Sequence, residues 1–196
     1  MTGPFPCRLL AMLALLVPIA SWAAPARVLE ASPPKAITDF ELTNQDGQPF
    51  RLSQLRGSPV LVFFGFSHCP DVCPLTLGQL QAVVSSRDSA VNQARVVMIS
   101  VDGDRDTPAA LKRYLASVSP DFIGLTGPPR RVRDIAAQFS AVFFKGTPAD
   151  ADGNYQVEHT AQVYLLDKQG RLHSTFFNAP ADVIAAATRQ VATENP

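Results

Sequence analysis

Residues 65–74, GFSHCPDVCP, place Cys69 and Cys73 four positions apart. They follow residues 60–64, VLVFF, a short run of β-branched and aromatic side chains that predicts a buried strand. Pro74 favours the first turn of a helix, and a regular apolar pattern follows it. Because residues i and i+4 share one face of a helix, we expect both sulfurs to point the same way, beyond the carboxyl end of the strand. Open α/β folds bind their ligands at that end.

The composition fits a single globular domain without a basic surface. The chain has 196 residues, of which 46% are hydrophobic and 17% are charged, enough for one well-buried core. Lysine and arginine together number 17, as do aspartate and glutamate, so the formal net charge is zero. Nucleic acids and acidic membrane surfaces both select a surplus of basic residues. The charge balance argues against either as the main partner, and we expect no nucleic-acid ligand.

Residues 1–24 have the pattern of a signal peptide or an N-terminal membrane anchor. Arg8 precedes an apolar stretch from Leu9 to Ala24, and residues 21–23, SWA, fit a small-x-small cleavage site. The stretch is shorter than the roughly 20 residues that a helix needs to span a bilayer. We expect a periplasmic protein, either soluble after signal cleavage or tethered to the inner membrane by this segment.

The folded part of the chain keeps two cysteines. Residues 25–35 are rich in alanine and proline and are interpreted as a linker, which leaves residues 36–196 as one domain. Cys7 lies before the apolar stretch, so the domain contains only Cys69 and Cys73. In an oxidising compartment, such a pair forms a disulfide, a redox couple or a metal site.

Strands and helices alternate along the domain. A turn signal at residues 44–47, NQDG, predicts a β-hairpin formed by residues 37–42 and 49–52. We expect further strands at residues 60–66, 95–101, 122–125, 141–144, 160–167 and 171–177, and helices at 75–86, 108–118, 128–140 and 180–192. This order predicts an α/β, thioredoxin-like fold: a central mixed sheet flanked by helices, with an N-terminal β-hairpin.

The cysteine spacing leaves three chemical roles open. A CxxC pair at a helix start is the redox signature of thioredoxins, whereas the spacer here has three residues. A structural disulfide, a redox pair and a metal site are all compatible with this spacing. Two thiolates on one face are soft ligands that select Cu(I) or zinc over magnesium or calcium.

A third ligand would have to be one of three histidines. His68 adjoins Cys69 and is expected at the exposed rim, because neighbouring side chains on a turn rarely converge on one ion. His173 alternates with apolar residues and is expected at a solvated strand position. His159 opens an apolar strand, where thioredoxin oxidoreductases carry a cis-proline facing the cysteines. Since residues 149–179 contain no proline, His159 is the best candidate for the third ligand.

Three segments resemble the Sco/SenC family of copper-binding assembly proteins. Residues 65–74 resemble the family pattern GF(T/S)xCPDVCP, and residues 99–108, ISVDGDRDTP, resemble SxDPxRDTP. Residues 157–160, VEHT, together with 164–167, YLLD, resemble VDHxxxxYLxD. The resemblance extends over roughly residues 36–192. The chain departs from it at Gly103, Glu158 and Asn154, and none of these positions is a ligand.

The resemblance implies a thioredoxin-like fold with Cys69, Cys73 and His159 as ligands of copper, as Cu(I), Cu(II) or both. It also implies delivery of copper to cytochrome c oxidase subunit II or another copper-accepting protein, for assembly of the dinuclear copper site. An upstream copper donor or a thiol reductant would then be a further partner. The resemblance does not indicate a conventional enzyme.

The alternative function is a thiol–disulfide oxidoreductase that acts on partner cysteines through the redox pair Cys69 and Cys73. The missing cis-proline and the three-residue spacer weigh against it. A peroxidase is disfavoured because the Pro-x-x-x-Thr-x-x-Cys motif is absent. Asp106 or Thr107 is expected to cap the helix that begins at Pro108. Arg105 and Asp106 are also expected to cap this helix and to brace the loop near the site, and Asp71 is expected to be a turn residue.

Overall fold

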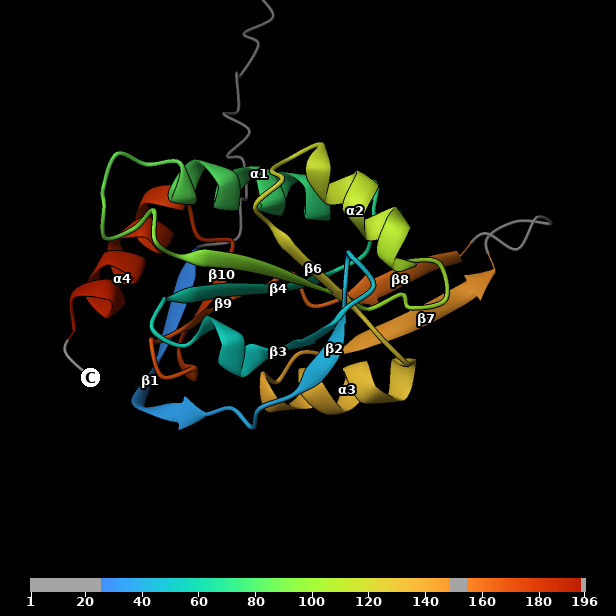
Figure 1. Ribbon diagram of the computed structural model, residues 1–196, viewed down its shortest axis with the longest axis horizontal. Coiled ribbons are helices and arrows are strands. Elements are labelled where there is room, and N and C mark those ends of the chain that lie inside the picture. The colour runs from blue at the N-terminus through green and yellow to red at the C-terminus, as the bar shows by residue number, and fades with distance from the viewer. Residues whose placement is uncertain (1–25, 149–154, 195–196) are drawn as a thin grey trace, which may run out of the picture.

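An eight-stranded mixed sheet lies at the centre of the computed structural model, which describes residues 26–148 and 155–194 (Figure 1). The strand order is β1-β10-β9-β4-β5-β6-β2-β3, and β7 and β8 form a separate two-stranded sheet. The strands are β1 (Arg27–Ala36), β2 (Glu41–Asn44), β3 (Pro49–Arg51), β4 (Val60–Gly65), β5 (Arg95–Ser100), β6 (Ile123–Thr126), β7 (Phe143–Pro148), β8 (Tyr155–His159), β9 (Val163–Leu166) and β10 (Arg171–Phe177). The helices are the 3-10 turn η1 (Leu52–Leu55), α1 (Val72–Val84), α2 (Pro108–Ala116), α3 (Pro129–Gln138) and α4 (Ala181–Thr193).

The central strands are buried on both faces. β4 pairs in parallel with β5, and β5 with β6, while β9 runs antiparallel to β4. Every residue of β4 is buried, which explains its unbroken apolar sequence. In Figure 1, α1 and α2 lie along one side of the sheet and α3 along the other, and α1 also contacts α4. The parallel strands β4 and β5 therefore end at one edge, just before the segments that carry the cysteine motif and the second motif.

The N-terminal hairpin forms as predicted. β2 and β3 are antiparallel, with Leu42 opposite Phe50. The Asn44 side chain closes the turn, because its Oδ1 atom accepts hydrogen bonds from the backbone N–H groups of Asp46 and Gln48. β2 also pairs with β6, so the hairpin extends the main sheet. The predicted α/β, thioredoxin-like arrangement with a mixed sheet, flanking helices and an N-terminal hairpin is confirmed.

The expected linker at residues 25–35 is wrong over most of its length. Residues 27–36 form β1, an edge strand that pairs antiparallel with β10. Its side chains are mostly exposed, so the alternating apolar pattern that predicts a strand is missing. Pro33 and Pro34 fall where the register with β10 shifts, and an edge strand tolerates proline because one row of its N–H groups needs no partner.

The segment before β9 also differs from its prediction. The sequence predicts no strand between residues 144 and 160 and places His159 at the opening of the strand that follows. Instead β7 continues to Pro148, and β8 pairs with it so that Phe143 lies opposite His159. His159 therefore ends a hairpin strand, and β9 begins only at Val163. The loop residues 149–154 lie outside the described part.

Within residues 26–148 and 155–194, no helix is both long enough and apolar enough to cross a membrane. The predicted signal peptide or anchor, residues 1–24, lies outside the described residues.

Gly124 in β6 lets α2 pack directly on the sheet. A Cβ atom at this position would lie 2.6 Å from Leu115 Cδ1 and 3.3 Å from Leu111 Cβ, in two buried residues of α2. We expect Gly124→Ala to lower the free energy of unfolding by about 1–3 kcal/mol, because it overpacks this contact. Urea denaturation measures the change.

The matched control is Gly78→Ala on the exposed side of α1, where a new Cβ atom meets nothing within 4 Å. This variant should be more stable than the wild type by about 0.5–1 kcal/mol, because alanine favours a helix over glycine. Wild-type stability in Gly124→Ala would contradict the close packing of α2 on β6.

Candidate metal site

The structure brings together the three predicted ligands, Cys69, Cys73 and His159. One donor atom from each residue, two sulfurs and one ring nitrogen, can be chosen so that all lie within 4.8 Å of one another. Cys73 Sγ is 3.5 Å from His159 Nε2, and both cysteines are free thiols. In the part of the chain that the structure describes, no other group of three histidine, cysteine or acidic residues meets the same condition.

The two cysteines come from different local structures. α1 begins at Val72, so Cys73 lies in its first turn whereas Cys69 lies in the loop before it. The expected helical i, i+4 face is therefore wrong for Cys69. Its sulfur converges on the site because the loop turns back, and the backbone N–H of Cys73 points to it at 3.4 Å.

The cysteines differ in their exposure to solvent. Cys73 is fully buried, whereas Cys69 is half-buried. Burial raises the pKa of the Cys73 thiol, and its hydrogen bond with Cys69 raises it further. Binding a metal ion must therefore displace a proton from Cys73, so metal affinity should rise with pH.

A buried carboxylate holds the loop that carries Cys69. Asp106 is fully buried and accepts hydrogen bonds from the Ser67 N–H at 3.0 Å, Ser67 Oγ at 2.5 Å and Ser100 Oγ at 2.6 Å. The predicted bracing role of Asp106 is confirmed. Of the two predicted caps, Thr107 is confirmed, because it is the N-cap of α2 and accepts a hydrogen bond from the Ala110 N–H, and Asp106 is wrong.

His159 is oriented by its other ring nitrogen. Nδ1 lies 3.1 Å from the Thr160 carbonyl oxygen, and because a carbonyl only accepts, Nδ1 carries the proton. The lone pair is then on Nε2, which faces Cys73. Phe63 and Phe66 pack edge-on to the ring with centroid distances of 6.0 and 5.7 Å. Burial lowers the pKa of His159, which favours the neutral ring that a metal ion requires.

The other two histidines do not join the cluster. His68 is exposed as predicted, and its Nδ1 lies 3.0 Å from Ser67 Oγ. The prediction for His173 is wrong, because its exposed fraction is only 8%. β10 is covered at both edges by β1 and β9, and His173 Nδ1 finds a partner in Ser174 Oγ at 2.8 Å. Its neighbours Leu172 and Ser174 are buried as well, so both faces of β10 are covered at this point, and the alternation in the sequence does not reveal this.

Sequence reasoning gave no role to two buried residues beside the site. Tyr155, at the start of β8, donates a hydrogen bond from its hydroxyl to Asp102 Oδ1 at 2.5 Å. Asp102 lies between β5 and α2, in the segment that resembled the second family motif. That motif and the position of Tyr155, four residues before His159, were the available signals.

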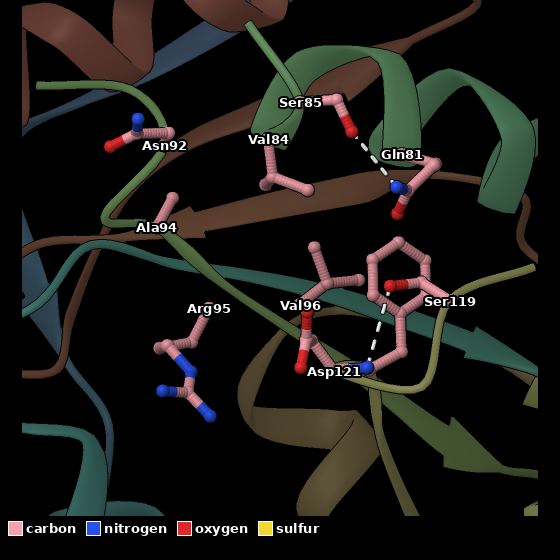
Figure 2. A pocket seen from close by; sticks show the side chains of 10 residues that line it. Gln81, Val84, Ser85, Asn92, Ala94, Arg95, Val96, Ser119 and Asp121 are labelled. Carbon is pink, nitrogen blue, oxygen red and sulfur yellow. Dashed lines mark hydrogen bonds between the residues drawn. The ribbon is translucent and has the colours of Figure 1, made fainter. Parts of the chain in front are cut away.

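Two hollows in the described part of the chain have no cysteine in their lining. Figure 2 shows a polar pocket of about 240 Å³ between the end of α1 and the start of β5, lined by Gln81, Arg95 and Asp121 among others. An apolar hollow of about 460 Å³ lies between α3 and β7 and includes Phe143 and Phe144. Neither is lined by a predicted ligand. The function of the cluster must therefore be argued from its three donor atoms, because neither of these two hollows contains them.

The donor set indicates which metal ions fit. Two sulfurs and one imidazole nitrogen are soft or borderline ligands, which suit Cu(I), Cu(II) or zinc and not magnesium or calcium. The same two thiols are close enough to take part in thiol–disulfide exchange.

Comparison with known proteins gives a consistent family. A family model described as SCO1/SenC matches residues 30–193. An SCO2-like protein of Rickettsia conorii is 37% identical over 139 residues, covering 71% of this chain and 68% of that protein. The structure of Bradyrhizobium japonicum ScoI with copper bound is 36% identical with a TM-score of 0.71, covering 80% of this chain and 99% of that one.

A third similar protein, BsSco, is described as having a disulfide switch and as a member of the Sco family of cytochrome c oxidase assembly proteins. It is 25% identical with a TM-score of 0.66, covering 83% of this chain and 96% of that one.

Gly65, the last residue of β4, leaves room for the Cys73 sulfur. A Cβ atom at Gly65 would lie 3.1 Å from Cys73 Sγ and 2.5 Å from Phe63 Cε1. We expect Gly65→Ala to displace Cys73 and to weaken Cu(I) binding by about tenfold or more, since a ligand site tolerates little misplacement. Competition with a chromophoric Cu(I) chelator measures the affinity. Gly78→Ala should bind like the wild type, and an unchanged affinity in Gly65→Ala would contradict this close fit.

Proposed function

The chain belongs to the SCO1/SenC family, and from this premise we propose that it carries copper on Cys69, Cys73 and His159 for the assembly of cytochrome c oxidase. The observation that carries the proposal is the convergence of these three donor atoms within 4.8 Å, from segments some ninety positions apart in sequence. The copper-bound structure of ScoI and the membership of BsSco in a family of cytochrome c oxidase assembly proteins both support it.

The ligand set fits both oxidation states of copper. Two thiolates and an imidazole hold Cu(I), which prefers soft ligands and few of them. Cu(II) makes greater use of the imidazole and takes further ligands where they are available. His159 is already neutral and aimed at Cys73, so little reorganisation accompanies loading.

Delivery would proceed from the Cys69 side. Cys69 is half-buried and adjoins the exposed His68, whereas Cys73 is fully buried. A thiolate of the acceptor would bond to copper as the bond to Cys69 breaks, and Cys69 would then take up a proton. Leu75, which is 67% exposed in the first turns of α1, offers an apolar contact for the acceptor. The acceptor we propose is subunit II of cytochrome c oxidase, at its dinuclear copper site.

The proposed compartment is the periplasm. The apolar stretch from Leu9 to Ala24 supports export, followed either by signal cleavage or by retention as a tether.

A second candidate function is thiol–disulfide reduction of partner cysteines. It is favoured by the free thiols of Cys69 and Cys73, whose sulfurs lie within 4.8 Å. The two thiols would give two electrons and two protons to a partner disulfide and become a disulfide themselves, and a thiol reductant would restore them. This reaction gives no role to His159, which is why copper binding is the better explanation of the site.

Substitution of His159 separates the two functions. We expect the reduced wild-type domain to bind one copper ion per chain, and His159→Ala to bind Cu(II) about 100-fold more weakly because a ligand is lost. Titration followed by spectroscopy and chelator competition measures both affinities. Reduction of a model disulfide should be the same in both proteins.

His68→Ala is the matched control, because His68 is one residue from Cys69 yet exposed and outside the cluster. Its copper affinity should equal that of the wild type. Undiminished copper binding in His159→Ala, together with rapid disulfide exchange, would instead establish the oxidoreductase.

A further inference from the structure

His159 lies at the end of β8, in the β7–β8 hairpin, which is not part of the main sheet. β7 and β8 pair only with each other, whereas the cysteines follow β4 at the centre of the main sheet. The ladder hydrogen bonds of the main sheet therefore do not fix the distance between His159 and the two sulfurs. Contacts from other parts of the chain must set it.

Tyr155, the first residue of β8, connects this hairpin to the loop between β5 and α2. Tyr155, Val157 and His159 alternate along β8, so they share one face of the strand. The Tyr155 side chain is 8% exposed and donates its hydroxyl hydrogen to Asp102 Oδ1 at 2.5 Å. Burial, then the hydrogen bond to Asp102, raises the pKa of Tyr155, so the hydroxyl keeps its proton at neutral pH.

Asp102 is itself held firmly. It is 4% exposed, and its second oxygen, Oδ2, accepts a hydrogen bond from Arg105 Nε at 2.5 Å. The Arg105 guanidinium carbon lies 3.8 Å from the centre of the Tyr155 ring, and Lys145 Nζ lies 4.0 Å from it. The Tyr155 ring thus makes cation–π contacts with Arg105 and Lys145, while its hydroxyl is hydrogen-bonded to the Asp102 carboxylate.

The same loop also holds the cysteines. The Asp102 N–H donates to Ser100 Oγ at 3.1 Å, Ser100 donates to Asp106, and Asp106 accepts from Ser67, two residues before Cys69. A continuous chain of hydrogen bonds therefore runs from the histidine hairpin to the cysteine loop through residues 100–106. This loop is therefore hydrogen-bonded to both halves of the metal site.

We propose that Tyr155 and Asp102 are positioning residues, which set the distance of His159 from the two sulfurs and by this means favour Cu(II) over Cu(I). The inference rests on the proposed copper-binding function. Two thiolates can retain Cu(I) without a well-placed imidazole, whereas Cu(II) depends on the nitrogen ligand. Loosening the hairpin therefore costs Cu(II) more than Cu(I).

The test is Tyr155→Phe, which removes the hydroxyl and keeps the ring between Arg105 and Lys145. We expect Cu(II) affinity to fall about tenfold while Cu(I) affinity changes by less than about threefold. A tenfold difference corresponds to a rise of about 59 mV in the potential of bound copper, a one-electron couple. The sulfur-to-Cu(II) absorption band and the Cu(II) electron paramagnetic resonance spectrum should change as well.

Thr188→Val is the matched control. It removes a buried hydroxyl that donates a hydrogen bond to the Ile184 carbonyl oxygen within α4, and it should leave the Cu(II) spectrum unchanged. Hydrogen exchange of the metal-free protein gives a second readout: backbone amides in β8 should exchange faster in Tyr155→Phe than in Thr188→Val. Asp102→Ala combined with Tyr155→Phe should cost little more Cu(II) affinity than the more damaging single variant, because both act on one contact.

The outcomes distinguish the proposal from its premise. Equal losses of Cu(I) and Cu(II) affinity in Tyr155→Phe, following a fall in thermal stability, would show a merely structural role and overturn it. Unchanged hydrogen exchange and unchanged spectra would overturn it too. A wild-type protein that bound no copper would refute the proposed function and the positioning role with it. Faster hydrogen exchange in β8 of Tyr155→Phe would in that case still show that the Tyr155 hydroxyl stabilises the hairpin.

Discussion

The metal site depends on the loop between β5 and α2, which is hydrogen-bonded both to the cysteine loop and to the histidine hairpin. Asp106 reaches the cysteine loop through Ser67, and Asp102 reaches the histidine hairpin through Tyr155. Both carboxylates are buried, and a buried carboxylate is tolerated only when it is well hydrogen-bonded. The bonds that satisfy these groups are the same ones that fix the ligands, so the stability of the loop and the geometry of the site are coupled.

The environments of the two sulfurs suit a carrier. In the proposed carrier, the fully buried Cys73 would retain the ion, and the half-buried Cys69 would give a partner access to it. The aromatic side chains of Phe63 and Phe66 pack around His159 and keep the imidazole neutral by excluding water. A site closed on all sides would bind copper well and release it slowly, because exchange of ligands needs an open position.

Two of the three departures from the family pattern, Gly103 and Glu158, fall in the described part of the chain, and neither is a candidate ligand. Glu158, where the family has aspartate, is exposed and lies on the opposite face of β8 from His159. Gly103, where the family has proline, lies in the bracing loop, and a Cβ atom on it would come within 2.5 Å of the Gly127 carbonyl oxygen. The backbone there is packed against the segment before α3. Asn154 lies outside the described residues.

The sequence by itself determined the features that depend on local pattern. The apolar run of β4, the proline-led start of α2 and the Asn44 turn were all predicted, because burial, capping and turn formation act over a few residues. The type and spacing of the cysteines indicated a disulfide, a redox pair or a metal site, and the position of His159 before an apolar strand made it the candidate third ligand. Only the tertiary structure showed that β1 is a strand, since an exposed edge strand is stabilised by pairing with β10 and carries no apolar alternation. It alone also joined Tyr155 to Asp102, because that hydrogen bond links residues 53 positions apart and neither residue's local sequence specifies the other.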